Sequence, residues 1–506
     1  MALKKRKFTY ALRSALCQPI KMKSTTDLPD ILVQDLENKW EAFEQSCAKH
    51  KISLPQDPQT WNPGEHEALR EVIRKKIVDS MATPPPASPP RDVRLPTVPG
   101  KVKAVIGPRR AGKTTFLWQV ITQALAGGVS RDGLLYFNFE DERLADLEAA
   151  SLHIVVEEYY RLHPDWRDRR EAVLLLDEIQ VVSGWESFVR RLLDSENVDV
   201  FLSGSSARLL SREVATSMRG RAMEALVYPF SFRESLRHRG IEPVGPVDRL
   251  PKAHRSRVDR ALRDYLTQGG FPEAQGLETR ERLELLKGYV DATMLRDVVE
   301  RHAVSQPIAL RWMVRHLLAN AAGSFSVHKF HADLRSQGFA VAKDTLHAFV
   351  AHLEDAFLIR TVSIATESER RRMANPRKAY PIDPGLIAIF DRSGRANLGH
   401  ALETAVALEL DRRGAEKAYV RTKDGHEVDF LARFVDGRQE LIQVCVNLED
   451  PETCERELRA LRGAALEHPR AKRCIIALDP VSAPRVSEDV VVHDAAAWLL
   501  EYDAVE

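Results

Sequence analysis

The residues with the most specific chemistry in this sequence lie between Gly107 and Thr115. The pattern G-x-x-x-x-G-K-[ST] is fitted by Gly107, Pro108, Arg109, Arg110, Ala111, Gly112, Lys113 and Thr114. In loops of this kind, backbone N–H groups and the start of the next helix bind phosphate, the lysine reaches the β- and γ-phosphates, and the hydroxyl ligates Mg²⁺. We therefore assign residues 107–115 to nucleotide binding, Lys113 to catalysis and Thr114 to the metal. The alternative is a chance glycine-rich turn before a helix.

A second motif lies downstream, where an apolar run over residues 172–176 ends in Asp177 and Glu178. Such a run is typical of a strand that is buried on both faces. We expect Asp177 to hold the magnesium and Glu178 to polarise a water against the γ-phosphate. Many buried strands end in solvated acids, so this motif alone is a weak indication of a metal site. It becomes informative because it follows the phosphate loop. Together the two motifs predict hydrolysis of a nucleoside triphosphate.

Further catalytic candidates follow the next apolar run, Val198 to Leu202. Ser205, in a Ser/Gly loop, could sense the γ-phosphate, or the loop could merely turn the chain. Arg219 and Arg221 are candidates for arginines that complete a neighbouring subunit's site and stabilise charge on the phosphate. This interpretation predicts a homo-oligomer; the alternative is a solvated basic face or an ordinary ion pair.

The carboxy-terminal part holds another constellation: Glu403 in a helix-like segment, Asp429 in a strand-like one and Gln443 in a second strand. This is the layout of the restriction-endonuclease-like PD-(D/E)XK fold, where acids hold Mg²⁺ and a lysine positions the attacking water. We take these three residues as candidate metal ligands. Cys445 stands where the lysine should be, and Lys423 is the first substitute to consider. The pattern favours a degenerate, binding-only nuclease fold over an active nuclease.

The elements that must position these residues indicate an α/β fold. We expect strands at 102–106, 134–139, 172–176 and 198–202 and a helix at 115–125, with Val227 to Phe230 as the next strand and its exit. A strand between the two motifs and a glutamate beside the metal aspartate indicate the additional-strand, AAA-like branch of P-loop ATPases.

Later segments read as helix, turn, helix and strand at 326–337, 342–356 and 357–365. This is the pattern of a winged helix, whose second helix would present Lys343, Thr345 and His347 to DNA, or a module that only packs against its neighbours. A basic cluster follows, either a phosphate patch or an exposed loop: Arg370, Arg371, Arg372, Arg377 and Lys378.

We therefore divide the chain into five parts. Residues 1–95 are a helical extension (helices at 36–51 and 65–81) with a basic start, an arm for nucleic acid or a solubilising tail, and a proline-rich linker at 84–90. An AAA-type ATPase core (96–245), a helical lid (246–320), a winged-helix-like module with the basic loop (321–397) and a PD-(D/E)XK nuclease-like domain (398–506) follow.

Composition narrows the class of protein. The 506 residues are too many for one core. With 74 Lys and Arg against 73 Asp and Glu, any binding of nucleic acid must come from local patches. Five cysteines without a C-x-x-C pair argue against a disulfide framework or a zinc ribbon. With neither a membrane-length apolar run nor a signal-peptide core, we expect a cytoplasmic protein without membrane contact.

Several motifs together resemble a known family. They are GPRRAGKTT, VLLLDEIQ, FLSGSSARLLSREVATSMRGRA, YPFSFRE, QGGFPEA and MLRDVVER. These segments are similar to the bacterial and archaeal AAA-type ATPases that carry a C-terminal domain of unknown function with a nuclease-like fold. The resemblance runs from about Val102 to the Ala460 region and implies an architecture more firmly than a biological role.

Three functions remain open. The first is an ATPase that acts on DNA, with the nuclease-like domain as a binding platform. The second is an ATP-regulated, Mg²⁺-dependent DNA nuclease in mobile-element or phage defence. The third is a signalling ATPase whose carboxy-terminal modules bind a protein partner.

Overall fold

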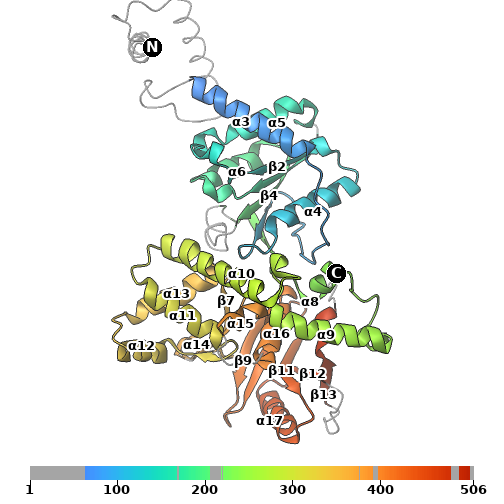
Figure 1. Ribbon diagram of the computed structural model, residues 1–506, viewed down its shortest axis with the longest axis vertical. Helices are drawn as coiled ribbons and strands as arrows, with labels where there is room; N and C mark the ends of the chain where they lie inside the picture. The colour runs from blue at the N-terminus through green and yellow to red at the C-terminus, as the bar shows by residue number, and fades with distance from the viewer. Residues whose placement is uncertain are drawn as a thin grey trace, which may run out of the picture. The chain divides into compact units, whose positions relative to one another are not determined.

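The computed structural model describes residues 63–167, 170–204, 218, 220–374, 376–390, 397–479 and 489–501 (Figure 1). The expected helix at 36–51, the basic start of the chain, Ser205 and Arg219 lie outside these residues. The described chain forms two compact units. The first contains residues up to Pro84 and Leu125–Phe201, and the second contains Pro85–Ala124 and the residues from Leu202 onwards.

The first unit is built on parallel strands. Its strand order is β2 (Leu134–Asn138), β3 (Ala172–Asp177) and β4 (Val198–Gly204), and β2 pairs with β3 in parallel so that Asn138 lies opposite Asp177. The helices are α3 (Pro63–Ala82), α5 (His153–Leu162) and α6 (Trp185–Ser195). The expected strands at 134–139 and 172–176 are confirmed.

Helix α3 packs against α5 and β2. Ile73 and Ile77, four residues apart and so on one face of the helix, are both fully buried. Arg70 and Arg74, also four apart, both reach the buried carboxylate of Glu158, at 2.6 and 3.0 Å. The helix expected at 65–81 is therefore confirmed. Its buried isoleucines and its ion pairs with Glu158 hold it in the first unit.

In the second unit, β1 (Val102–Ile106) lies between the end of β4 and β5 (Ala222–Leu226), and it pairs with β5 in parallel. Helix α4 (Lys113–Ala126) follows β1 directly after the loop. The strand expected to begin at Val227 is β5, which instead ends at Leu226. Val227 still donates to the Ile106 oxygen (2.7 Å), but Pro229 has no N–H to continue the ladder.

Helices dominate the next part of the second unit. They are α8 (Phe232–His238), α9 (Lys252–Gln268), α10 (Thr279–Ala292), a π-helical segment (Thr293–Glu300) that continues α10, and α11 (Pro307–Ala319). None of the helices in the described part of the chain is both long and apolar enough to cross a membrane.

A small antiparallel sheet follows, in the order β6 (Ser324–Phe325), β8 (Arg377–Pro381), β7 (Ile359–Val362). The associated helices are α12 (Val327–Ser336), α13 (Lys343–Asp355), α14 (Glu369–Ala374) and α15 (Ile387–Phe390). The expected order of helix, turn, helix and strand is confirmed.

The last sheet has the order β13 (Val490–Asp494), β12 (Lys472–Asp479), β11 (Gln439–Asn447), β10 (Glu427–Arg433), β9 (Glu416–Arg421). Strands β9, β10 and β11 pair antiparallel, and β11, β12 and β13 pair in parallel. Helix α16 (Leu398–Arg412) precedes the sheet and α17 (Pro451–Glu467) joins β11 to β12 (Figure 1). Helix α18 (Ala495–Leu500) follows β13. The elements expected to carry Glu403, Asp429 and Gln443 are therefore present.

Candidate nucleotide site and acid pocket

The loop between β1 and α4 has backbone angles that glycine adopts readily. Gly107 and Gly112 have φ values of +151° and +93°, and Arg110 lies in the left-handed region with φ 63°. A Cβ atom on Gly107 would lie 2.1 Å from the Val227 carbonyl oxygen, so only glycine fits where the chain leaves β1. The loop thus turns tightly against the exit of β5.

Lys113 is the first residue of α4 and is 5% exposed. Its ammonium donates to the carbonyl oxygens of Gly107 (3.1 Å) and Pro108 (2.8 Å) and so lies over its own loop. The first turn of α4 contains no acidic residue. The first N–H groups of any α-helix lack a carbonyl partner within the helix and point towards its N-terminal end. Exposed Thr114 and half-buried Thr115 follow in the same turn. A lysine beside a helix N-terminus fits an anion such as a phosphate chain.

Asp177 ends β3 in the first unit and is fully buried. Its Oδ2 accepts hydrogen bonds from the Tyr136 hydroxyl (2.7 Å) and from Asn138 (3.4 Å) on β2. Burial, and then the charge of Asp177, raise the pKa of Tyr136 far above its usual value, so that the hydroxyl stays a donor. These two donors fix the orientation of the carboxylate.

Glu178 follows in the left-handed conformation, with φ 55°. Non-glycine residues rarely adopt this conformation, and such strain clusters at functional positions. The half-buried carboxylate accepts a hydrogen bond from the Gln180 side chain. The structure thus places Asp177 and Glu178 at the end of one strand, as the sequence predicted. The orientation of the buried aspartate and the strain of the glutamate are additional findings.

Arg221 lies at the far end of β1 from the phosphate loop of its own unit. Its carbonyl oxygen accepts from the N–H of Val102, the first residue of β1, at 2.8 Å, whereas the phosphate loop follows the last residue, Ile106. A five-residue strand spans roughly 16 Å. The side chain is half-buried. Arg221 therefore does not join the phosphate loop of its own chain.

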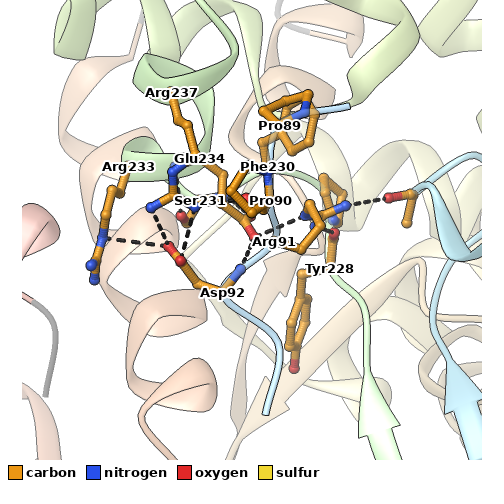
Figure 2. Close-up of polar contacts among 12 residues, drawn as sticks. Pro89, Pro90, Arg91, Asp92, Tyr228, Phe230, Ser231, Arg233, Glu234 and Arg237 are labelled. Carbon is orange, nitrogen blue, oxygen red and sulfur yellow. Dashed lines mark hydrogen bonds and ion pairs between the residues drawn. The ribbon is translucent and has the colours of Figure 1, made fainter. Parts of the chain in front are cut away.

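Sequence reasoning missed Arg91, which lies in the segment before β1. Figure 2 shows its side chain among Tyr228, Phe230 and Glu234. Its guanidinium donates to Glu234 (2.8 Å), to the Ala111 carbonyl oxygen of the phosphate loop (2.9 Å) and to the Tyr228 carbonyl oxygen (2.5 Å). It also lies over the Phe230 ring, 4.8 Å from the centroid. Both charged side chains are about 95% buried, with 4% and 5% exposed.

Glu234 also caps α8. Its carboxylate accepts from the Ser231 N–H while the Ser231 hydroxyl accepts from the Glu234 N–H, which is a capping box. The Ser-x-x-Glu spacing within YPFSFRE is the sequence signal for this cap, but nothing in the spacing points to Arg91. One carboxylate thus fixes both the start of α8 and the arginine that holds the phosphate loop.

The carboxy-terminal candidates line one cavity of about 660 Å³, which Glu403, Glu427, Asp429, Gln443 and Glu457 share. Asp429 lies at an irregularity in the pairing of β10 with β9, between Val428 and Leu431. Such irregularities redirect side chains and are common near active sites. The structure therefore brings together the three residues that the sequence proposed as metal ligands, and it adds two acids.

A lysine that the sequence did not assign to this pocket lies among its acids. The Lys378 ammonium is 3.0 Å from Glu403 and 2.9 Å from both Glu427 and Asp429, and its side chain is 4% exposed. Burial lowers the pKa of Lys378, but the three acids more than offset this and raise it above its usual value. Lys378 was expected in an exposed basic patch, which is wrong, because it faces the acids from β8, the middle strand of its sheet.

The neighbouring side chains also differ from an ordinary metal site. The Gln443 side-chain oxygen accepts from the Asp429 N–H (3.2 Å), and its amide nitrogen donates to Glu457. Burial raises the pKa of Cys445 to about 12, so its thiol is neutral. Lys423 is exposed, in the turn after β9. Within the described residues, no group of three or more His, Cys, Asp or Glu side chains is arranged to hold a metal ion.

The basic cluster is otherwise on the surface. Arg370, Arg371 and Arg377 are exposed, and Arg372 is half-buried beside Glu369 (2.9 Å). On α13, Lys343 and His347 are exposed and Thr345 is half-buried.

Comparison with known proteins places this architecture in a family. Residues 99–236 match the AAA domain family, and residues 259–395 match a domain of unknown function (DUF8612). An uncharacterized protein of Methanocaldococcus jannaschii is 33% identical over 379 residues, which cover 74% of this chain and 81% of the relative. The chain belongs to this family of AAA-type ATPases.

Other known proteins are similar to this AAA-type ATPase in sequence or in structure. An uncharacterized protein of Haemophilus influenzae is 29% identical over 352 residues, covering 69% of this chain and 83% of the relative. Among solved structures, the Walker-type ATPase of Pyrococcus abyssi has 16% identity and a TM-score of 0.37, and the match covers 63% of this chain and 95% of that one.

Proposed function

We propose that this AAA-type ATPase binds ATP with Mg²⁺ and hydrolyses it. The observation that carries the proposal is the loop of Gly107 to Thr115, in which the Lys113 ammonium lies over the loop carbonyls at the N-terminus of α4. A phosphate chain is the ligand that this arrangement fits, because it offers charge to the lysine and oxygen atoms to the backbone N–H groups.

The residues then take separate roles. Lys113 binds the β- and γ-phosphates, while the Thr114 hydroxyl and Asp177 hold the metal, which neutralises charge on the phosphate oxygens. Glu178 accepts a proton from the attacking water. The hydrogen bonds from Tyr136 and Asn138 keep the Asp177 carboxylate oriented for its role.

Phosphate release from ATP by the purified protein tests this proposal. We expect Mg²⁺-dependent turnover that is lost in the Lys113→Ala variant together with nucleotide binding. A wild-type protein that neither turns over ATP nor gains thermal stability from ATP and Mg²⁺ contradicts the proposal.

We also propose that the ATPase acts on DNA. The order α11, β6, α12, α13, β7, β8 supports a winged-helix module, and exposed cations lie on it at Lys343, Arg370, Arg371 and Arg377. Phosphate contacts from such side chains give binding that does not depend on sequence.

The carboxy-terminal domain in this proposal is a degenerate nuclease-like fold that binds without cleaving. Lys378 neutralises part of the acid pocket from within the chain, and the neutral Cys445 thiol cannot take the place of the expected lysine. The arginine at 221 lies far from its own phosphate loop, which supports action on a neighbouring subunit and hence a homo-oligomer.

A further inference from the structure

The two arginines of the phosphate loop pair with acids from the α10 region. Arg109 makes a two-pronged contact with Asp297, Nε to Oδ2 and NH2 to Oδ1, both at 2.7 Å. Arg110 contacts Glu273 at 3.1 Å. The acids lie in QGGFPEA and MLRDVVER, two motifs to which the ATPase function assigns no role.

The two pairs differ in burial. The Asp297 side chain is 4% exposed and that of Arg109 is 30% exposed, whereas Arg110 and Glu273 are 61% and 50% exposed. An exposed pair contributes little, because water screens it. A buried carboxylate that loses its guanidinium is left uncompensated, and the planar fork of arginine fixes the geometry of the contact. The Arg109–Asp297 pair therefore carries the interaction between the loop and the α10 region.

Asp297 also lies on an unusual stretch of helix. It belongs to the π-helical segment Thr293–Glu300, which continues α10. π-Helical turns are rare, interrupt the regular helical register and occur frequently at functional positions. This segment holds Asp297 against a loop that itself contains a strained residue, Arg110, with φ 63°. The unfavourable loop conformation needs support from outside the loop.

We propose that Asp297 is a positioning residue for ATP binding: through Arg109 it holds the phosphate loop in the conformation that receives the phosphates. The proposal rests on the ATPase function proposed above. It also links nucleotide binding to the position of the helix that contains α10 and the π-helical segment. Because such coupling is reciprocal, bound nucleotide stabilises the pair as much as the pair favours nucleotide.

The proposal predicts a specific kinetic signature. When the pair is broken, the loop spends less time in the receptive conformation, and apparent affinity falls in proportion to that fraction. Once ATP is bound the loop is in place, so the chemical step is unchanged. Asp297→Asn should therefore raise the KM for ATP about tenfold, as for a receptive fraction of about one tenth, and leave kcat within about twofold.

Glu273→Gln is the matched control, since it makes the same change of carboxylate to amide beside the neighbouring arginine of the loop. We expect its KM to stay within about twofold of the wild type, because that pair is exposed. Arg109→Gln should raise KM as Asp297→Asn does, and the double variant should be no worse than either single one, because one contact is removed. The proposal is overturned if Asp297→Asn and the wild type have equal KM values. It is also overturned if the increases in KM of the two single variants multiply in the double variant.

Circular dichroism and thermal unfolding check that each variant folds. If Asp297→Asn does not fold, Arg109→Lys replaces it, since lysine keeps the charge but cannot form the fork. An unchanged KM in Arg109→Lys then overturns the proposal, and a raised KM with retained kcat supports it. Absence of ATP binding in the wild type contradicts the ATPase function itself, whereas wild-type turnover with unaffected variants contradicts only the role of Asp297.

Discussion

The Arg91 guanidinium donates a hydrogen bond to the carbonyl oxygen of Ala111 at 2.9 Å, so a residue outside the motif holds the phosphate loop from within the protein. The same guanidinium is paired with buried Glu234. Arg91→Met removes the cation, leaves the carboxylate unpaired and should lower the free energy of unfolding by about 3–5 kcal/mol. Urea denaturation measures this. Arg280→Met, which removes an exposed arginine, should cost less than about 1 kcal/mol.

The loss of unfolding free energy caused by Arg91→Met should depend on pH. Burial alone raises the pKa of Glu234, but Arg91 outweighs it and holds the pKa below the usual 4.5. The wild type thus gains stability from Glu234 above pH 4.5 and loses it as the pH falls through the lowered pKa. In the variant, burial is no longer opposed by Arg91, so the carboxyl favours its protonated form. The difference in unfolding free energy should therefore be largest near pH 7 and shrink towards pH 4; a pH-independent difference contradicts this pairing.

Glu178→Gln should separate binding from hydrolysis. The amide removes the group that accepts the proton from water, but it leaves Lys113 and the loop intact. We expect turnover to fall about a hundredfold or more while nucleotide affinity stays near that of the wild type. Fluorescent-nucleotide titration and phosphate release measure the two quantities. A variant with a normal rate of turnover removes Glu178 from the mechanism.

Arg221 offers a test of assembly. If it acts on the neighbouring subunit, mixing Arg221→Ala with Lys113→Ala should restore some ATPase activity, because hybrid assemblies contain intact composite sites. Each variant alone serves as the control. A protein that stays monomeric with ATP and turns it over at full rate contradicts an arginine acting between subunits.

The surface arginines give a prediction for DNA. Exchanging Arg370, Arg371 and Arg372 together for glutamate should weaken binding to all sequences alike, and wild-type affinity should fall steeply with salt. Fluorescence anisotropy at several salt concentrations measures both effects, with Arg280→Glu as a control on an exposed arginine outside the cluster. Unchanged affinity in the triple variant would instead favour a protein partner.

The sequence was most informative where chemistry and local structure coincide. The runs at 102–106 and 172–176 are apolar enough to predict buried strands, and the motifs that follow them fix the direction of the chain. The contacts that hold these sites together were not predictable, because they join residues far apart. Arg91 and Glu234 are separated by 143 positions and Arg109 and Asp297 by 188. Periodicity reports on neighbours along an element and carries no information about such partners.

Lys378 shows the same limit more sharply. In the sequence it stands beside Arg377 and reads as part of a basic surface, yet β8 carries its ammonium to Asp429, 51 positions away. Glu457 was likewise missed, since it is one of several acids on the amphipathic helix α17 and only the fold places it against Gln443. Lys423, considered as a substitute from the adjacent strand, is exposed instead.

The acid pocket provides the last prediction. With Lys378 paired to Glu403, Glu427 and Asp429 and with a neutral thiol at Cys445, the wild type should show no cleavage, or very weak cleavage, of DNA with Mg²⁺ or Mn²⁺. Cys445→Lys adds the missing cation without touching the acids, and any cleavage that it gains should disappear when Asp429→Ala is added. Gel assays on single- and double-stranded DNA, with and without ATP, measure this. The opposite result would be strong, ATP-independent cleavage by the wild type that is lost in both Asp429→Ala and Lys378→Met. That result would make Lys378 the lysine of an active nuclease, because among the described residues it is the one buried ammonium in contact with the acids.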